Sequence, residues 1–318
     1  MKFFYTFSIL LFAELIFAQS EAQHTFDCQK MGTKFQFIYY HTAKKDTQSI
    51  DSQLIEKLNY LNQIFSDYEP TSEISRLSAS AGTGKKVKVS EELWRVLKAS
   101  RKISRKSDGA FDISIGPLSK LWRSMFRKRE IFDGVKINNK KKLVNYKKVE
   151  LYPFSRRVKL KKPEMRLDAG GIAKGFALDE LGNVFRKNGI TAFLIDGGGD
   201  ILVGNAPPKT NGWKIHLTTN FSSEMYEEEI VSVNNCAIAS SGDTYRFLEA
   251  NGKRYSHIID PRTGYGVSHQ QIVNVLANSG LHADAIASTL SVLPKTEWAN
   301  FLKKVKKLRI QVWRMGEE

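Results

Sequence analysis

Apolar residues recur at helical spacing in several segments of the chain. In the clearest of them, residues 51–68, one face of a 3.6-residue repeat carries Leu54, Leu58, Leu61, Ile64 and Phe65. A proline follows and should end this helix. The same pattern predicts helices over 90–107, with Ser90 as a credible N-cap, over 171–189 and over 282–293.

Strand-like segments fill much of the rest. The first covers residues 32–42, and further strands and turns lie within 150–168, 191–205, 214–219, 227–241 and 270–280. Because helices and strands mix without strict alternation, the pattern favours an α+β fold over a doubly wound sheet. We expect one globular unit over residues 23–318, with a mixed or antiparallel sheet core flanked by helices.

The first twenty residues are typical of an export signal. Lys2 gives a positive start, residues 3–18 are mostly apolar, and Ala18 and Ser20 are small residues that suit cleavage. Glu14 interrupts the apolar run, which is also short for a permanent membrane span of about 20 residues. The sequence therefore predicts a signal peptide at residues 1–20 and an exported protein.

The formal net charge of +16 raises the question of an anionic partner. Lysines and arginines cluster at residues 136–148, 154–164 and 301–309. The first two clusters are mixed with strand-like pieces, which favours a solvated hairpin face. Attraction of an anionic ligand or lipid is a second interpretation. No nucleic-acid motif accompanies the charge, so we predict no nucleic-acid partner.

Cys28 and Cys236 are the two cysteines of the chain, and their spacing fits no metal site. In an oxidising compartment they could form a disulfide, or both could remain free thiols with Cys236 in an apolar strand. The sequence leaves both possibilities open.

One acidic turn stands before a helix that begins with glycines. In "RLDAGGIAKGF", Asp168 precedes Gly170 and Gly171. The backbone groups at such a helix start are free to hold an anion, or to offer a carbonyl oxygen to a metal. The alternative is an ordinary capped helix. The turn "IDGGGDI" is similarly open: it is a tight hairpin, or Asp196 and Asp200 frame a close approach to a ligand.

A second group of candidate site residues lies on the helix predicted over 282–293. Asp284 and Ser288 are four residues apart and therefore share a helix face. Hard cations such as Mg²⁺ bind carboxylate, hydroxyl and carbonyl oxygens, so the pair could be part of a metal site. The alternative is an acidic residue favoured by the helix dipole.

Two more residues have both a structural and a chemical interpretation. His257 lies in "RYSHIIDPRTGYG", between a tyrosine and an acidic turn. It could be a satisfied turn histidine or a general base. Tyr68, just beyond the first helix, could stack on a ring or fill a turn.

Taken together, these clusters resemble the ApbE family, the FAD:protein FMN transferases. The resemblance is carried, in order along the chain, by "KMGTKF", "FSDYEPTSEISRL", "SDGAFDISIGPLSKLW", "LDAGGIAKGFALDEL", "IDGGGDILVGN", "SSGDTYRF", "RYSHIIDPRTGYG" and "HADAIASTLSVL". It covers nearly all of the mature chain. It implies an α+β fold, a periplasmic protein that could associate with the outer face of the inner membrane, FAD as substrate and Mg²⁺ as metal.

The resemblance also implies roles for residues. His257 matches the proposed catalytic histidine. Asp284 and Ser288 match the metal-binding helix, with the carbonyl of Gly171 as a third protein oxygen; Ser288 replaces the usual threonine and keeps the hydroxyl. The positions that match the FAD-binding set are Met31, Tyr68, Ala110, Phe111, Asp112, Asp168, Lys174 and Ile259.

In this chemistry a threonine or serine hydroxyl of an acceptor protein attacks the FMN-side phosphorus of FAD, and AMP leaves. The resemblance implies an acceptor with a D-x-x-[ST]-G-A-[ST] motif, such as a subunit of a membrane redox complex. Two alternatives share the same residues. One is a pyrophosphatase that splits FAD into FMN and AMP, and the other is a protein that binds FAD without turnover.

Overall fold

The computed structural model describes residues 21–131, 133–221, 226–242, 246–250, 252–306 and 311–313. The predicted signal peptide, residues 1–20, lies outside the described residues, as do Asp243 to Tyr245 of the "SSGDTYRF" segment. In the described part of the chain, no helix has the length and apolarity needed to cross a membrane.

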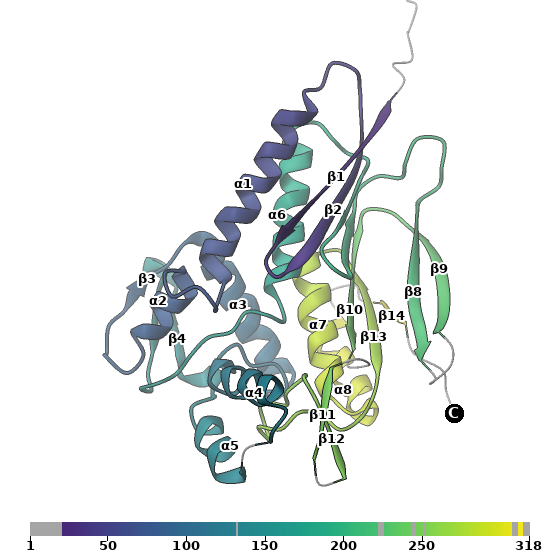
Figure 1. Cartoon of the computed structure of the whole chain (residues 1–318). Helices are drawn as coiled ribbons and strands as arrows, with labels where there is room; N and C mark the ends of the chain where they lie inside the picture. Colours follow the sequence, from purple (N-terminus) through teal and green to yellow (C-terminus); the bar gives the residue numbers. More distant parts are fainter. Residues whose placement is uncertain are drawn as a thin grey trace, which may run out of the picture.

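An antiparallel sheet forms the centre of the fold (Figure 1). Within the described residues its strand order is β1-β2-β6-β7-β10-β13-β14. Every neighbouring pair is antiparallel. The strands are β1 (Ala22–Lys30), β2 (Thr33–His41), β6 (Phe193–Asp196), β7 (Asp200–Val203), β10 (Cys236–Gly242), β13 (Ile272–Ala277) and β14 (Gln311–Trp313). The predicted α+β class is confirmed, and the sheet is antiparallel rather than mixed.

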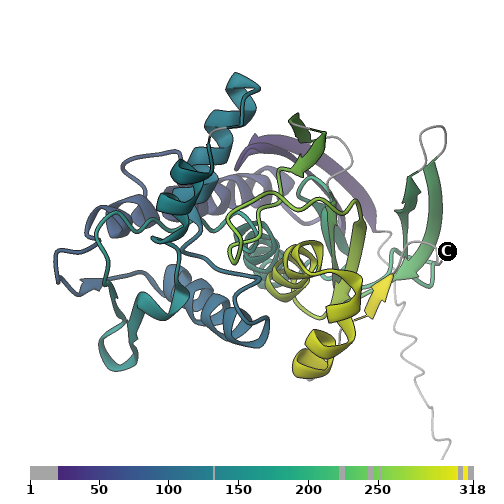
Figure 2. The ribbon, with the colours of Figure 1, turned by 90° about the horizontal axis from the view of Figure 1, so that it is seen from below.

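Helices cover one face of this sheet, and a β-hairpin covers part of the other. Alternate residues of β2 face the helices, and Phe35, Phe37 and Tyr39 are fully buried there. The helices are α1 (Thr47–Phe65), α6 (Ala173–Lys187) and α7 (Gly280–Val292). Figure 2 shows α6 and α7 side by side in the middle of the molecule. The hairpin of β8 (Trp213–Phe221) and β9 (Tyr226–Val233) packs against Val203 and Ile238 on the opposite face.

Smaller elements surround this core. The helices are α2 (Glu73–Ala79), α3 (Glu91–Lys106), α4 (Gly116–Lys128), α5 (Gly134–Lys141) and α8 (Lys295–Val305). A small sheet has the order β3-β5-β4, with β3 (Val87–Lys88), β4 (Val149–Tyr152) and β5 (Arg157–Leu160). A separate ribbon pairs β11 (Phe247–Ala250) with β12 (Lys253–Ser256).

The predicted helices are confirmed with shifted ends. Helix α1 begins four residues earlier than predicted, because the side chain of Asp46 accepts a hydrogen bond from the Ser49 N–H and caps it. Ser90 caps α3 as predicted, with its hydroxyl oxygen 3.2 Å from the Leu93 nitrogen. The sequence pattern missed α2, α4, α5 and α8, which are short or begin with Gly-Pro.

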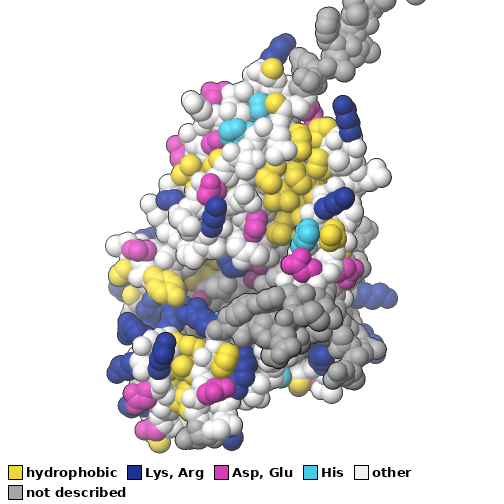
Figure 3. All heavy atoms as spheres, turned by 45° about the vertical axis from the view of Figure 1, so that its right-hand side comes forward, with side chains coloured by type: hydrophobic (Ala, Val, Ile, Leu, Met, Phe, Trp, Pro, Cys, Tyr) yellow, Lys and Arg dark blue, Asp and Glu magenta, His cyan; other side chains and the backbone are white. Residues whose placement is uncertain are grey.

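The interpretation of residues 136–148 as a hairpin face was wrong. Most of this lysine-rich run belongs to α5 and to a 3₁₀ turn, η1 (Tyr146–Lys148). One apolar side chain explains why this segment packs as a helix: Ile137 is fully buried against Leu118 and Trp122 of α4. The second run does form the predicted hairpin, β4–β5. Figure 3 shows lysine and arginine side chains gathered on the lower left of one face and an apolar patch above them.

The two cysteines are free thiols in the structure. Cys28 lies on β1 and Cys236 on β10, and β2, β6 and β7 separate these strands in the sheet. At about 4.8 Å per strand the separation is roughly 19 Å, far beyond the reach of a disulfide. Burial raises the pKa of the Cys236 thiol to about 11, which keeps it protonated and unreactive.

Candidate functional site

A cleft of about 1070 Å³ brings together the residues that the sequence singled out. It is lined by the β1–β2 turn, the α1–α2 loop, the loops before α4 and α6, the first turn of α6, helix α7 and the segment after β12. The twelve predicted site residues all contribute to its wall: Met31, Tyr68, Ala110, Phe111, Asp112, Asp168, Gly171, Lys174, His257, Ile259, Asp284 and Ser288.

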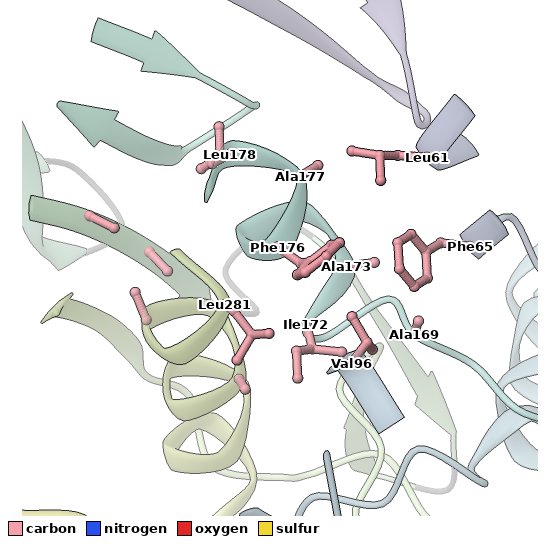
Figure 4. Close-up of a cluster of buried hydrophobic side chains, with 14 of the residues drawn as sticks. Leu61, Phe65, Val96, Ala169, Ile172, Ala173, Phe176, Ala177, Leu178 and Leu281 are labelled. Atoms are coloured by element: carbon pink, nitrogen blue, oxygen red, sulfur yellow. The ribbon is translucent and has the colours of Figure 1, made fainter. Parts of the chain in front are cut away.

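The deep end of the cleft is fixed by a close contact between α6 and α7. A Cβ atom on Gly175 would lie 2.0 Å from the Gly280 carbonyl oxygen, and one on Gly280 would lie 2.3 Å from the Gly175 carbonyl oxygen. Only two glycines allow the backbones this approach. The start of α6 is also packed among buried apolar side chains of α1, α3 and α7, such as Phe65, Val96 and Leu281 (Figure 4).

The start of α7 is held by α6 as well. Its N-cap residue, Ser279, makes no capping bond of its own to the helix backbone. Instead the Asp179 carboxylate of α6 accepts hydrogen bonds from the N–H groups of Gly280 and Leu281, at 2.6 and 3.0 Å. The free backbone donors of α7 are thereby satisfied from the neighbouring helix. Asp179 was not predicted as important, and its place in "LDEL" gave no sign of it.

The crossing places Asp284 and Ser288 beside the loop that precedes α6. Asp284 is 5% exposed, and its Oδ2 accepts a hydrogen bond from the Gly175 N–H at 2.9 Å. A Cβ atom on Gly171 would lie only 2.8 Å from the Ser288 hydroxyl oxygen. The carboxylate, the hydroxyl and the glycine loop thus lie close together, as the family resemblance implied.

A half-buried lysine completes the charge balance there. Lys174 Nζ lies 2.6 Å from Asp200 Oδ2, and Asp200 is 2% exposed. Burial alone would lower the pKa of Lys174, but the carboxylates of Asp200 and Asp284 outweigh it and raise that pKa. Burial first, and then the charge of Asp200, raise the pKa of Asp284 to about 7. Two carboxylates therefore share one cation, and the deep end can accept further positive charge.

These groups fit a hard divalent cation. Within the described parts of the chain, no three His, Cys, Asp or Glu side chains come together to hold a metal, which disfavours a zinc-type site. The oxygens of Asp284, Ser288 and the Gly171 backbone match the ligands of Mg²⁺, which keeps several waters and takes few protein ligands. The absence of a side chain at Gly171 leaves the space that a cation beside Ser288 would need.

The mouth of the cleft is built differently, from loops joined by ion pairs. Arg123 of α4 lies 2.6 Å from Asp67 Oδ2 and 2.8 Å from Asp168 Oδ2. Its guanidinium carbon is 4.2 Å from the centre of the Tyr68 ring. Tyr68 itself is 72% exposed. It therefore fills no turn, and its ring is available to stack against a ligand.

His257 directly follows β12 and lies on the wall of the cleft. The Arg246 carbonyl oxygen accepts a hydrogen bond from the His257 backbone N–H at 2.9 Å and lies 3.1 Å from its Nδ1. Because a carbonyl only accepts, Nδ1 carries the proton and Nε2 carries the lone pair of the neutral ring. Gly266 lets the next segment pass closely, since a Cβ there would meet the Ser256 carbonyl oxygen at 2.2 Å.

Two predicted acidic residues have structural partners. Asp112 accepts hydrogen bonds from the backbone and hydroxyl of Ser114 at 2.8 and 2.7 Å, and from the Tyr146 N–H at 2.8 Å. Burial nevertheless raises its pKa. Asp196 accepts from the N–H groups of the two glycines that follow Gly197, which supports the hairpin interpretation of that turn.

Sequence reasoning missed Arg123 and Asp67. Arg123 is 56 residues from Asp67 and 45 from Asp168 along the chain, so no local pattern connects them. The one available signal was the position of Arg123 directly after Trp122 on an amphipathic helix, and that helix was not predicted.

Comparison with known proteins gives consistent results. The sequence model of the ApbE family matches residues 31–312. An FAD:protein FMN transferase of Chlamydia muridarum is 29% identical over 313 residues, which are 95% of each chain. One of Haemophilus influenzae is 27% identical over 275 residues, 83% of this chain and 78% of the relative.

Solved structures share the fold. The flavin transferase ApbE of Vibrio cholerae superposes with a TM-score of 0.82 at 24% identity, over 92% of this chain and 93% of that one. The ApbE protein of Thermotoga maritima gives 0.81 at 24% identity, over 92% and 93%. At this level of sequence identity, the superpositions show the fold alone.

Proposed function

The chain belongs to the ApbE family, and from that premise we propose that it is an FAD:protein FMN transferase that attaches FMN to an acceptor protein. The observation that carries this proposal is one cleft that holds a base-competent histidine, a lysine paired with a buried carboxylate, and an exposed tyrosine. These are the groups that transfer of a flavin phosphate requires: a proton acceptor, a binder of pyrophosphate charge and a surface for a flat ring.

The proposed reaction is a phosphoryl transfer. The hydroxyl oxygen of a threonine or serine of the acceptor forms a bond to the FMN-side phosphorus of FAD. The bond between that phosphorus and the bridging oxygen breaks, and AMP leaves with the bridging oxygen. Nε2 of His257, which carries the lone pair, takes the hydroxyl proton. General-base assistance of this kind contributes about 100- to 10,000-fold in rate.

The deep end binds the pyrophosphate in this proposal. Asp284, Ser288 and the Gly171 carbonyl would hold Mg²⁺. When bound, the cation would neutralise pyrophosphate charge and polarise the phosphorus. Lys174 adds a positive charge at the start of α6.

The remaining wall residues would bind the rest of FAD. Tyr68 supplies a stacking surface at the mouth. Other members of the proposed FAD-binding set are Met31, Ala110, Phe111, Asp112, Asp168 and Ile259, which line the same cleft. Asp112 contributes by holding the loop before α4 in place, given its bonds to Ser114 and Tyr146.

We further propose where the protein works. The signal-like residues 1–20 support export to the periplasm, where the enzyme would meet an acceptor flavoprotein at the outer face of the inner membrane. An acceptor carrying D-x-x-[ST]-G-A-[ST], such as a subunit of a membrane redox complex, would supply the hydroxyl.

Mass spectrometry tests the proposal directly. Protein beginning at Glu21 is incubated with FAD and Mg²⁺, with and without an acceptor domain bearing the motif. The expected result is an acceptor heavier by FMN less water, with AMP released. His257→Ala and Asp284→Ala should lose this gain. His216→Ala, an exposed histidine paired with Glu228, is the matched control and should keep it.

The other outcomes identify the alternatives. Free FMN and AMP beside an unmodified acceptor would make the protein an FAD pyrophosphatase. FAD that is bound and recovered unchanged with every acceptor would leave a flavin-binding protein and would refute catalysis.

A further inference from the structure

We propose that Arg123 is a positioning residue that couples the mouth of the cleft to its deep end: it holds the Tyr68 ring for stacking and orients the loop that carries the Gly171 carbonyl. The inference deepens the proposed function and rests on it. Arg123 matches none of the positions that the family resemblance implied.

The guanidinium joins three segments that are far apart in the chain. It extends from α4, reaches the α1–α2 loop at Asp67 Oδ2 over 2.6 Å and reaches the loop before α6 at Asp168 Oδ2 over 2.8 Å. The two bonds come from different terminal nitrogens. A planar fork of donors can bridge two carboxylates in this way, whereas an ammonium group offers one compact charge.

The first effect of this bridge is on Tyr68. The guanidinium covers one face of the Tyr68 ring at 4.2 Å, the geometry of a cation over an aromatic face. The preceding residue, Asp67, is held by the same arginine and by Arg166, which donates to the Asp67 carbonyl oxygen. The loop is thereby fixed from two sides, and the ring of Tyr68 stays exposed at the mouth. We infer that a flat ring of FAD stacks there.

The second effect reaches the deep end through Asp168. While its Oδ2 is held by Arg123, its Oδ1 accepts a hydrogen bond from the Gly170 N–H at 2.8 Å. The next residue, Gly171, is the one whose backbone approaches Ser288. One guanidinium thus sets the orientation of a carboxylate, and that carboxylate sets the conformation of the glycine loop.

Charge explains why a cation is needed at this place. Burial first, and then the charge of nearby Asp168, raise the pKa of Asp67. Loss of the cation would leave two neighbouring carboxylates facing each other with little solvent. Their repulsion would separate the Tyr68 loop from the glycine loop, which are the two parts of the site that must act on one substrate.

The experiment compares Arg123→Lys with Arg95→Lys. Arg95 is a matched control: it pairs with Glu180 at 2.7 Å and lies over the Phe176 ring at 4.8 Å, but it does not line the cleft. Binding of FAD is measured by flavin fluorescence without metal, and the Mg²⁺ dependence of thermal stability is measured without FAD. Arg123→Lys should weaken FAD binding roughly tenfold and raise the Mg²⁺ concentration for half-maximal stabilisation several-fold. Arg95→Lys should change neither.

Combination with Tyr68→Ala tests the coupling at the mouth. If Arg123 acts through Tyr68, then the double variant should bind FAD about as weakly as the worse single variant, because effects on one shared contact are not additive. Binding of FMN and AMP in separate titrations shows which ring of FAD the tyrosine holds: only the half that stacks should lose affinity in Tyr68→Ala.

Several results would overturn the inference. One is that Arg123→Lys and Arg95→Lys bind FAD equally well and respond to the same Mg²⁺ concentrations. Another is that the losses of FAD affinity in the double variant with Tyr68→Ala are fully additive. If Arg123→Lys shows a lowered melting temperature without any change in affinity, then the residue is structural only. A wild-type protein that binds FAD but modifies no acceptor would refute the proposed transferase and leave the binding role of Arg123 standing.

Discussion

The deep end of the cleft and its mouth are built from different kinds of contact. At the deep end, Gly175 and Gly280 bring two helix backbones together, and Asp284 is almost completely buried beside them. At the mouth, loops are joined by the charges of Arg123, and Tyr68 is mostly exposed. Close backbone packing allows one arrangement at the deep end, whereas the arrangement of the loops at the mouth depends on the charged side chains that join them. The deep end therefore suits fixed chemistry on a pyrophosphate, and the mouth suits the entry of two substrates.

The largest expected effects test whether the two regions act at different steps. His257→Ala should slow FMN transfer by about 100- to 10,000-fold while FAD still binds, because the loss concerns proton transfer. Asp284→Ala should lose transfer and also the response to Mg²⁺. Rates of acceptor labelling and FAD affinities measured on the same preparations separate the two cases. If His257→Ala weakens FAD binding as strongly as it slows transfer, then its role as base is wrong.

The difference in contacts between the deep end and the mouth also determines which residues could be predicted from the sequence. Deep-end residues lie in short motifs, so that Asp284 and Ser288 at four-residue spacing indicated their shared helix face directly. The amphipathic period likewise predicted α1, α3 and α6. Arg123 could not be found in this way, because its partners are 56 and 45 residues distant. Contacts made by tertiary packing leave no local pattern, and the contact between Gly175 and Gly280 is another example.

The next effect concerns the pH dependence of stability at the deep end. The pKa of Asp284 is about 7 in the folded protein and near 3.8 when unfolded. Between these values the folded state holds a proton that the unfolded chain has lost, so the free energy of unfolding falls as the pH rises from 4 to 7. The difference between the two pKa values corresponds to at most about 4 kcal/mol. Asp284→Asn should therefore make the metal-free protein more stable at pH 8 than the wild type.

Thermal unfolding at pH 5 and pH 8, with and without Mg²⁺, measures this effect. Mg²⁺ should stabilise the wild type more at pH 8, because the cation competes with a proton for Asp284. Asp284→Asn should show little response to Mg²⁺ at either pH. Asp108→Asn, which changes an exposed carboxylate paired with Lys304, is the control and should behave as the wild type. Equal Mg²⁺ stabilisation of Asp284→Asn and wild type would rule out this carboxylate as a ligand.

A smaller effect tests whether packing fixes the deep end. Gly175→Ala places a methyl group 2.0 Å from a backbone oxygen of α7, which has to move. Such overpacking costs about 1–3 kcal/mol. Gly182→Ala lies on the same helix, but its nearest neighbour is the end of the Leu202 side chain at 2.6 Å, which can rotate away. Urea unfolding should show Gly175→Ala clearly less stable than Gly182→Ala. Two equally stable variants would mean that the helices tolerate a wider separation.

The smallest effect separates the ring of Tyr68 from its hydroxyl group. Because the ring is 72% exposed and Arg123 covers one of its faces, a stacked ligand should depend on the aromatic surface. Stacking of this kind contributes about 0.5–1.5 kcal/mol, so Tyr68→Ala should weaken FAD binding by roughly two- to tenfold. Tyr68→Phe keeps the ring and should bind FAD as the wild type does. Calorimetric titration distinguishes these values. If Tyr68→Phe were as weak as Tyr68→Ala, then the hydroxyl group would bind the ligand, and stacking on the ring would contribute little.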